Sequence, residues 1–434
     1  MKDFIIKLLD LKPEDIKNMD IVDIQNITHI TITLNQHPHR CPRCFKYTDK
    51  IKEYKNKVYV HQIVRNRDTY IYYNARRYIC PYCRKTFNED NPFDKKYSSI
   101  TNATLINILD DLKHYTATYT HIAQKYNISP TTVMNIFDNH VQIPRHKLQD
   151  IVCIDEFYFN RHSKYKYAFI IVGFRNKLII DIVESRWQTS LSDYFFSIGY
   201  EERKIVKYVC MDMYINYKNI VNIYFPDAII CIDSFHVLKR INDSLNTLRK
   251  RICRRYDHDS REYKLLKYRY RLLLKNGEYI NNHSYYFDKI LGYTTNESGV
   301  LECILSIDDD LRRAYKLKED YRFFNSVKEE EFRSQEYLQV FDTLIESFLF
   351  SEIKEMVEAG KTLRNWREEI FNSFIWIDGR RISNGCIEGK NNYIKKILSN
   401  ANGMKNFDRA RNRIMYSQNL HERYSISVKN KIKK

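Results

Sequence analysis

The chain contains the run Ile151-Val152-Cys153-Ile154-Asp155, in which four apolar residues are followed by an acid. A second apolar run that ends in an acid is Ile205-Val206-Lys207-Tyr208-Val209-Cys210-Met211-Asp212. Runs of this length and composition predict buried β-strands. Open α/β sheets place their chemistry at the carboxyl ends of such strands. We therefore expect Asp155 and Asp212 to lie at the ends of strands of one sheet.

A third acid lies in a different setting. Glu388 belongs to the segment Ser383-Asn384-Gly385-Cys386-Ile387-Glu388-Gly389, where a polar turn leads into a helix predicted from Asn391 to Leu398. Mg²⁺ prefers oxygen ligands and keeps several waters, so two Asp and one Glu suit a metal site for phosphodiester chemistry. If the three carboxylates converge, the protein cuts or joins nucleic acid. Taken singly, an acid at a strand end is more often a solvated loop residue.

The composition favours a nucleic-acid partner. The 434 residues include 72 Lys and Arg against 54 Asp and Glu, and their formal net charge is +18. A chain of this length is expected to form two to four domains, and its positive surface attracts polyanions such as nucleic acid. No stretch approaches the ~18 uncharged apolar residues of a membrane-spanning helix, and residues 1–10 do not resemble a secretory signal. We expect a cytoplasmic protein.

Four of the ten cysteines form two closely spaced pairs, Cys41-Pro42-Arg43-Cys44 and Cys80-Pro81-Tyr82-Cys83. Each pair can give two thiolates to one tetrahedral Zn²⁺, and the residues between the pairs can form the β-hairpin of a zinc ribbon. A site closed by four thiolates has no open position, so its role would be structural. Arg76 and Arg77 beside the second pair suit contacts with DNA phosphates, although they are equally consistent with an ordinary solvated face.

A helix-turn-helix is predicted between Thr120 and Phe137. Ser129 can cap the second helix and Pro130 suits its first position. The residues that the second helix would expose to the major groove of DNA are Thr131, Thr132 and Asn135. A plain helical hairpin would use the same apolar spacing, so the DNA-binding interpretation depends on the neighbouring cysteine pairs and on the charge.

The order of the remaining patterns predicts a mixed α/β sheet followed by a long helical block. Strands are expected at residues 27–34, 151–154, 167–173, 178–183, 205–211 and 228–232, with helices near 189–198 and 217–224. Residues 1–36 are expected to begin with a short helix. Residues 235–376 are expected to be almost wholly helical and are very basic at their start.

Several further motifs occur in a fixed order along the chain. They are Arg76-Arg77-Tyr78-Ile79-Cys80-Pro81-Tyr82-Cys83-Arg84-Lys85-Thr86-Phe87, Ile154-Asp155-Glu156-Phe157, Cys210-Met211-Asp212-Met213-Tyr214, Phe225-Pro226-Asp227-Ala228, Asp233-Ser234-Phe235-His236-Val237-Leu238-Lys239 and Ser383-Asn384-Gly385-Cys386-Ile387-Glu388-Gly389-Lys390-Asn391-Asn392. Together they resemble a bacterial insertion-sequence transposase of the DDE class, in the branch called ISL-three, over nearly the whole chain. Two features depart mildly from that pattern: Lys390, where an apolar residue is usual, and Ser399-Asn400, where basic residues are common.

The resemblance implies an RNase H-like catalytic fold with a helical insertion before the last acid. It places the catalytic triad at Asp155, Asp212 and Glu388, with Mg²⁺ or Mn²⁺ as the cofactor. It also implies an activity, which is to bind the terminal inverted repeats of an insertion sequence and to catalyse metal-dependent strand cleavage and strand transfer. Candidates to orient the catalytic groups are Glu156, Asp233 and His236, for which plain structural hydrogen bonding is an equal alternative.

The expected organisation is a multidomain α+β protein. The expected parts are a zinc-ribbon module (1–96), a helix-turn-helix module (97–147), the first part of an RNase H-like core (148–234), a helical insertion (235–376) and the last part of the core (377–434). The expected partner is double-stranded DNA, and because two element ends must be brought together we expect a homodimer on DNA, associated with the nucleoid when bound.

Two alternatives stay open. A transposase-derived regulator would bind DNA without metal-dependent cutting, and a structure-selective nuclease on the same fold would cut branched DNA without needing element ends.

Overall fold

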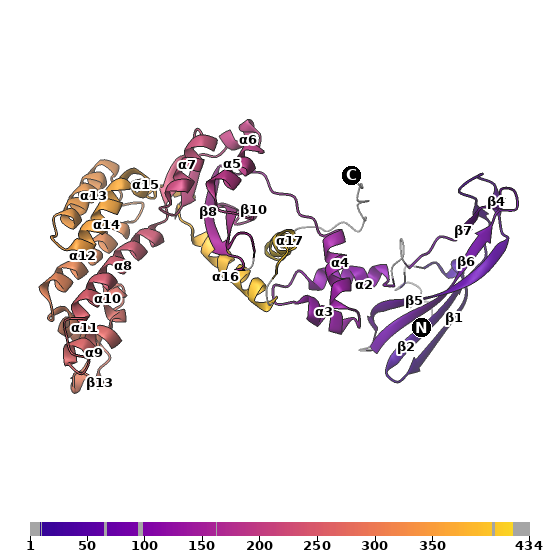
Figure 1. The fold of residues 1–434 in the computed structure, drawn as a ribbon, viewed down its shortest axis with the longest axis horizontal. Helices are drawn as coiled ribbons and strands as arrows, with labels where there is room; N and C mark the ends of the chain where they lie inside the picture. Colours follow the sequence, from indigo (N-terminus) through magenta and orange to yellow (C-terminus); the bar gives the residue numbers. More distant parts are fainter. Residues whose placement is uncertain are drawn as a thin grey trace. The chain divides into compact units, whose positions relative to one another are not determined.

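The computed structural model describes residues 9, 11–64, 67–93, 99–161, 163–401 and 404–419. The expected mixture of helices and sheets is confirmed (Figure 1). The chain divides into two compact units, of which unit 1 comprises Met1–Pro144 with Asn392–Lys434 and unit 2 comprises Arg145–Asn391. Within the described ranges, no helix combines the length and the apolar character that crossing a membrane requires.

Unit 1 contains a five-stranded sheet with one buried face. Its strands follow the order β1-β2-β6-β5, and β7 also pairs with β6. Buried and less buried residues alternate along most of β6, which is the pattern of a strand with one face on a core. Ile32, Ile71 and Tyr73 belong to that core. The strands are β1 (Ile16–Ile24), β2 (Ile27–Leu34), β5 (Ile51–Val64), β6 (Arg67–Ile79) and β7 (Thr86–Asn88).

The start of this sheet differs partly from the prediction. The strand predicted over residues 27–34 is confirmed as β2. Before it, a short 3-10 helix at Pro13–Asp15 is followed by a strand that was not predicted, β1 at Ile16–Ile24. Gln25 and Asn26 connect the two strands with positive φ angles of 51° and 65°. Two consecutive residues of this conformation match the twist of an antiparallel hairpin. Residues 1–8 and 10 lie outside the described part of the chain.

Helices from both ends of the sequence pack together in unit 1. The side chain of Arg413 is buried, and its guanidinium donates hydrogen bonds to the carbonyl oxygens of His114 and Ala117. Tyr416 donates to the carbonyl of Leu109, and Arg409 pairs with Asp138. Helix α17 thus completes a helical cluster that begins more than 260 positions earlier. The helices of this cluster are α2 (Asn102–Asp111), α3 (Tyr119–Lys125), α4 (Pro130–His140) and α17 (Phe407–Gln418).

Unit 2 contains a second five-stranded sheet, with the order β10-β9-β8-β11-β12. Strands β8, β11 and β12 are parallel, whereas β9 runs antiparallel to both of its neighbours. The strands expected from the sequence in this region are confirmed with two main differences: β8 continues three residues past Asp155, which was expected to end it, and β11 begins at Tyr208 and not at Ile205. The strands are β8 (Ile151–Tyr158), β9 (Tyr167–Gly173), β10 (Ile179–Val183), β11 (Tyr208–Met211) and β12 (Ile229–Ile232).

Both faces of this sheet are covered. Val152 and Ile154 of β8 belong to the same apolar core as residues of α5 (Gln188–Phe196) and α7 (Ile215–Tyr224). Side chains alternate between the two faces of a strand, so Cys153 points to the opposite face. There its thiol lies 3.6 Å from the carbonyl oxygen of Ser383, just before α16 (Gly385–Asn400). The segment that leads into α16 therefore covers the second face.

The block between the two halves of unit 2 is mainly helical, as expected. Helix α8 (Ser234–Cys253) packs against α12 and α14, and a short hairpin of β13 (Tyr286–Asp288) and β14 (Tyr293–Thr295) interrupts the helices. The other helices are α9 (Arg261–Tyr268), α10 (Arg271–Leu274), α11 (Glu297–Leu305), α12 (Asp309–Asn325), α13 (Ser334–Leu349), α14 (Lys354–Asn365) and α15 (Arg367–Asn372).

One buried cation links two helices of this block. Lys318 of α12 is 0% exposed, and its Nζ donates hydrogen bonds of 2.9 Å to the carbonyl oxygens of Leu273 and Lys275. These carbonyls end α10 and would otherwise lack partners. Burial lowers the pKa of Lys318 to about 8. The side chain thus acts as a cap supplied by a neighbouring helix.

Replacing Lys318 with Met is expected to destabilise unit 2 by about 1–3 kcal/mol, because the variant leaves buried carbonyl oxygens without hydrogen-bond donors. Calorimetry should show a melting transition that is about 2–4 °C lower for each kcal/mol lost. Lys316→Met on the same helix is the matched control, since Lys316 is exposed. Equal melting temperatures for the two variants would contradict the capping role.

Candidate active site and cysteine cluster

The register of unit 2 places three acids in one row. Cys153 of β8 lies opposite Cys210 of β11, and Cys210 lies opposite Cys231 of β12. Asp155, Asp212 and Asp233 each lie two residues after one of these cysteines. A step of two residues keeps a side chain on the same face, and neighbouring strands lie about 4.8 Å apart. The three carboxylates therefore lie one step beyond Cys153, Cys210 and Cys231 and on the same face of the sheet. The segment that leads into α16 covers this face.

Asp155 is the most perturbed of these acids. Burial, and then the charge of Asp212, raise the pKa of Asp155 to about 7. Its Oδ1 accepts a hydrogen bond from the backbone N–H of Glu156, and its Oδ2 accepts one of 2.9 Å from Nδ2 of Asn391. Asp155 and Asp212 follow the last parallel pair of two adjacent strands, and like charges on neighbouring strands repel each other when both are ionised. A cation between them would relieve that repulsion.

His236 lies beside the other two acids of the row. Its Nε2 is 2.9 Å from Oδ1 of Asp212 and 3.9 Å from Oδ2 of Asp233. Burial alone would lower the pKa of His236, but the hydrogen bond and the charge of Asp212 outweigh it, and the pKa is raised. Asp233 is 5% exposed, and burial raises its pKa. His236 thus contacts Asp212 and lies near Asp233, so its imidazole connects two of the three acids of the row.

Glu388 lies in the first turn of α16. Asn384, four residues earlier, donates from Nδ2 to the carbonyl of Ile154 and from its backbone N–H to Asp233. Asn391, three residues later, donates to Asp155. Residues at these spacings share one face of a helix. Glu388 is therefore carried on the face of α16 that turns towards the acid row, and its charge acts on Asp233.

The three predicted catalytic acids do not form a closed metal cage. Among the described residues, four cysteines form the group of His, Cys, Asp or Glu side chains whose ligand atoms all lie within 4.8 Å of one another. The three acids, all within the described ranges, do not form such a group. Asp155 and Asp212 are brought together, whereas Glu388 is exposed on its helix turn.

The residues at the acid row nevertheless fit a hard divalent cation. Oδ1 of Asn384 and Oδ1 of Asn391 are buried, and neither has a hydrogen-bond partner among the described residues. A buried amide oxygen without a donor is costly, and carboxylate and amide oxygens are ligands that such cations accept. Two unpartnered oxygens beside two mutually repelling carboxylates form a donor set of suitable chemistry.

Glu156 points to the other face of β8. It forms an ion pair with Arg186 and accepts a hydrogen bond from the hydroxyl of Tyr217 on α7. The guanidinium of Arg186 also lies over the ring of Tyr167, at 4.6 Å from its centroid. The side chain of Glu156 therefore connects β8 with Arg186 and with α7. Among the described residues, no recorded contact joins this side chain to Asp155.

Sequence reasoning gave no role to Asn384, which directly precedes α16, or to Asn391 within it. Their signal was present, because Asn384, Glu388 and Asn391 follow one another at steps of four and three residues. This spacing places all three on one helix face. Sequence reasoning also missed Arg186 and Tyr217, for which no local pattern exists.

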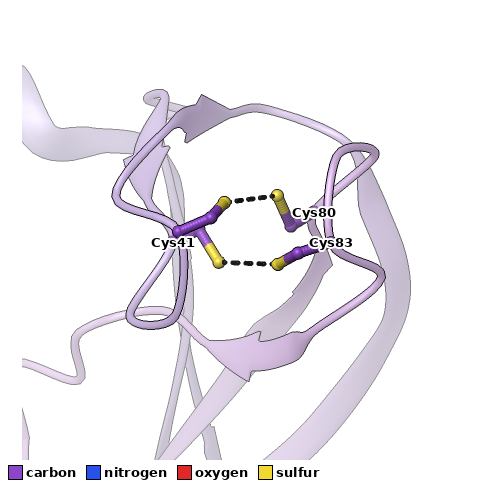
Figure 2. A group of neighbouring side chains, drawn as sticks. Cys41, Cys80 and Cys83 are labelled. Atoms are coloured by element: carbon purple, nitrogen blue, oxygen red, sulfur yellow. Dashed lines mark hydrogen bonds between the residues drawn. The ribbon is translucent and has the colours of Figure 1, made fainter.

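The four cysteines of the two predicted pairs meet in unit 1. Sγ of Cys41 is 3.5 Å from Sγ of Cys83, and Sγ of Cys44 is 3.4 Å from Sγ of Cys80 (Figure 2). All four sulfur atoms lie within 4.8 Å of one another. This arrangement can hold one metal ion and brings together residues about 40 positions apart.

The two cysteine pairs have the same backbone geometry. Phe45 and Arg84, each four residues after the first cysteine, have φ angles of 62° and 56°. Their N–H groups bond to the carbonyls of Cys41 and Cys80 at 2.9 Å. Burial opposes ionisation of Cys41, but hydrogen bonds from backbone N–H groups outweigh it and lower its pKa to about 6. In Cys44, by contrast, the backbone hydrogen bond from Lys46 is outweighed by burial and the neighbouring thiols, which raise its pKa to about 12. A lowered thiol pKa favours the thiolate that binds metal.

Arg76 and Arg77 differ in their surroundings. Arg76 is 5% exposed and donates to the carbonyl oxygens of Leu34 and Asn35. It also pairs with Glu89 at 3.5 Å, so its guanidinium has little surface left for a phosphate. Arg77 is one-third exposed and pairs with Glu53. Ala75 and Arg76 are both buried, which breaks the alternation of β6.

The helices α3 and α4 occupy the positions expected for the helix-turn-helix. Oγ of Ser129 accepts a hydrogen bond from the N–H of Thr132 and lies 2.8 Å from its hydroxyl. Thr131 and Asn135 are exposed one turn apart on α4. Of the three DNA contacts predicted on α4, Thr132 is therefore engaged in the cap, while Thr131 and Asn135 are exposed.

Comparison with known proteins identifies the family. No curated protein matches the chain. The family model described as Transposase, of the DDE class and the ISL-three type, matches residues 152–414. This range covers more than half of the chain and includes the acid row and α16. The chain therefore belongs to the ISL-three family of DDE transposases.

Proposed function

We propose that the protein binds the terminal inverted repeats of its own insertion sequence and catalyses metal-dependent strand cleavage and strand transfer. Membership of the family implies an enzyme that cuts and transfers DNA. The observation that carries the proposal is the acid row: Asp155 lies two residues past the last parallel pair of β8 with β11, Asp212 directly follows β11, and Glu388 lies in the first turn of α16.

In this proposal the sheet of unit 2 is an RNase H-like core. The strand order supports this interpretation. Strands β8, β9 and β10 form an antiparallel meander, β11 pairs in parallel with β8, and β12 pairs in parallel with β11. The chain positions of the acids also support it, because a helical block separates the first two from the third. The proposed domain boundaries at residues 96, 147, 234 and 376 remain predictions.

The proposed metal ligands are the carboxylates of Asp155, Asp212 and Glu388, with the amide oxygen of Asn391 as a further candidate. Bound Mg²⁺ or Mn²⁺ would supply the positive charge that activates an attacking oxygen and stabilises a leaving oxygen. Asn391 would hold Asp155 in place through its Nδ2, and His236 would hold Asp212. Asp233 and Asn384 would connect the start of α8 with the start of α16.

Unit 1 is the proposed DNA-recognition unit. Its cysteine cluster would hold one structural Zn²⁺, because four thiolates leave no open position. The α4 face with Thr131 and Asn135 would enter the major groove, and Arg77 would contact a phosphate. A homodimer on DNA remains a prediction, based on the need to pair two element ends.

A strand-transfer assay with defined terminal repeats tests the proposal. Purified protein with Mg²⁺ should cut a duplex that carries one terminal repeat and join the 3′ end to target DNA. A regulator would bind the repeat without cutting it. A structure-selective nuclease would cut branched DNA equally well with and without the repeat. Either result would overturn the proposal.

A further inference from the structure

Helix α8 begins at the acid row and carries an excess of positive charge. Between Ser234 and Arg255 there are seven Lys and Arg residues and one acid, Asp243. Sequence reasoning noted this basic stretch, but the acid site and the recognition unit do not account for it. Three of these cations bind other groups of unit 2, whereas Lys239, Arg240, Lys250 and Arg254 are exposed and have no ion pair recorded in the described part of the chain.

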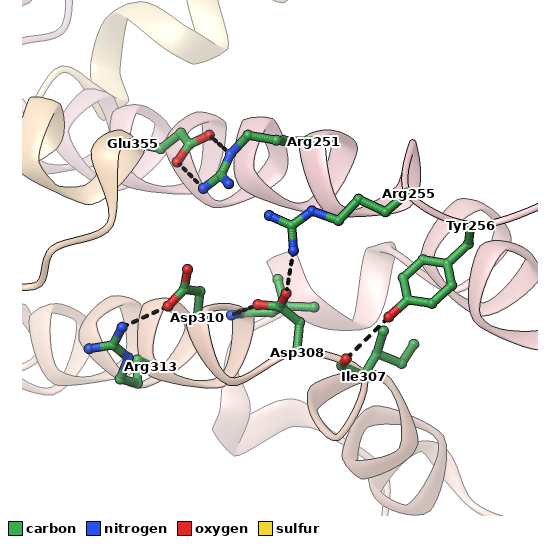
Figure 3. Close-up of polar contacts among 9 residues, drawn as sticks. Arg251, Arg255, Tyr256, Ile307, Asp308, Asp310, Arg313 and Glu355 are labelled. Atoms are coloured by element: carbon green, nitrogen blue, oxygen red, sulfur yellow. Dashed lines mark hydrogen bonds and ion pairs between the residues drawn. The ribbon is translucent and has the colours of Figure 1, made fainter.

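Three of the cations bind other groups of unit 2. Arg249 is buried and donates to the carbonyl of Leu266. Arg251 pairs with Glu355 of α14, and Arg255 pairs with Asp308 at the start of α12 (Figure 3). These pairs fasten α8 to the helical block. Arg249 lies within the face of α8 that packs on the helical block, and the exposed Arg251 and Arg255 lie at the edge of that face.

Other cations lie on a face without such partners. Lys239, Lys250 and Arg254 are exposed, and within the described ranges the structure records no ion pair for any of them. Lys250 follows Lys239 by eleven residues and Arg254 follows Lys250 by four, so the three lie within about 60° of one another around the helix. They form a stripe, which we call the α8 stripe, and the exposed acid Asp243 lies on the same face four residues after Lys239.

The α8 stripe starts at the proposed active site. Lys239 lines a hollow of about 250 Å³ together with Asp212 and His236. From Lys239 to Arg254 the stripe extends along the helix for about 22 Å, at 1.5 Å per residue. One DNA strand places a phosphate every ~3.4 Å of helix axis, so this length matches about six base pairs.

We infer that the α8 stripe binds the sugar-phosphate backbone of the DNA duplex that adjoins the bond to be cut. This inference rests on the proposed function, because it starts from the acid row as the place of chemistry. Lys and Arg spaced along one exposed helix face suit phosphates, which give position and affinity. Such contacts carry no base sequence, so the surface would hold flanking DNA of any sequence.

The test compares two variants with the same loss of charge. Lys250→Gln with Arg254→Gln removes two stripe cations that lie away from the acids. Lys289→Gln with Lys316→Gln removes two exposed cations elsewhere in unit 2. Binding of the full chain to a duplex that carries one terminal repeat and its flank is measured by fluorescence anisotropy over a series of salt concentrations.

Each lost phosphate contact reduces the slope of log K against log salt by about 0.9. The stripe variant should therefore lose about 1.8 from the slope and bind about 10- to 100-fold more weakly at low salt, while the control pair keeps the wild-type slope. Lys250→Arg with Arg254→Lys should also keep it. An unchanged slope in the stripe variant, with an unchanged melting temperature, overturns the inference.

The same experiment separates this inference from the proposed function. Binding is measured without divalent metal, so a protein that fails to cut DNA can still show the change in slope. The stripe variant should lose salt-dependence slope on the duplex with the flank but keep the wild-type slope on a repeat that ends at the cleavage position. That result would assign the α8 stripe to flanking DNA. Equal loss on both duplexes would place the stripe on the repeat and contradict the assignment.

Discussion

Asp155→Asn should lose Mg²⁺-dependent cleavage of element ends by about a thousandfold or more, which corresponds to about 4 kcal/mol of transition-state stabilisation. Asp155 lies beside Asp212 in the acid row and has a raised pKa because of burial and that neighbouring charge. An amide at this position keeps the shape of the side chain but removes the negative charge. The variant should therefore fold and bind DNA while it fails to cut.

The matched control is Asp193→Asn, which removes an exposed acid of α5 in the same unit. It should cut at the wild-type rate. Rates are measured on a labelled duplex that carries one terminal repeat, and DNA affinity and melting temperature are measured in parallel. Near wild-type cleavage by Asp155→Asn would refute the assignment of Asp155 to the metal site.

Replacing Cys41 with Ser should abolish stoichiometric metal binding and largely remove DNA binding by unit 1. The four sulfur atoms hold together two backbone loops, and structural Zn²⁺ contributes about 10–16 kcal/mol in zinc-finger peptides. Loss of one thiolate opens the site and frees both loops. Atomic emission should find one zinc per wild-type chain and far less in the variant, with a lower melting temperature for unit 1.

Cys303→Ser is the control for this experiment, because Cys303 is a partly exposed thiol outside the cluster. It should keep one zinc per chain and wild-type DNA affinity. A strong chelator should reproduce the effect of Cys41→Ser on the wild-type protein. Wild-type protein that contains no metal yet binds DNA and melts cooperatively would show that the cluster needs no ion.

The sheet of unit 2 and its first two acids were predictable because their cause is local. An apolar run such as Ile151-Val152-Cys153-Ile154 indicates a buried strand whichever strands it later pairs with. The period of two then fixes which face Asp155 and Asp212 share. The cysteine pairs were predictable for a similar reason, since their spacing matches the reach of one metal ion.

The other features depend on contacts between distant residues. Arg76 follows a basic and aromatic pattern that resembles a solvated face, yet carbonyls of Leu34 and Asn35 draw its guanidinium inwards. Asn391 acquires its position only when α16 packs on a sheet formed more than 200 residues earlier. No window of the sequence contains such information, because it arises from the packing itself.

The α17 contacts also determine when unit 1 can form during synthesis. Arg413 and the carbonyl of His114 that it bonds are 299 residues apart. A ribosome adds about 5–20 residues per second, so about 15–60 s pass between the synthesis of the two partners. During that time the end of α2 lacks the side chains that complete it. A nascent chain therefore cannot form the full helical cluster of unit 1 before Asp155, Asp212 and Glu388 have been translated.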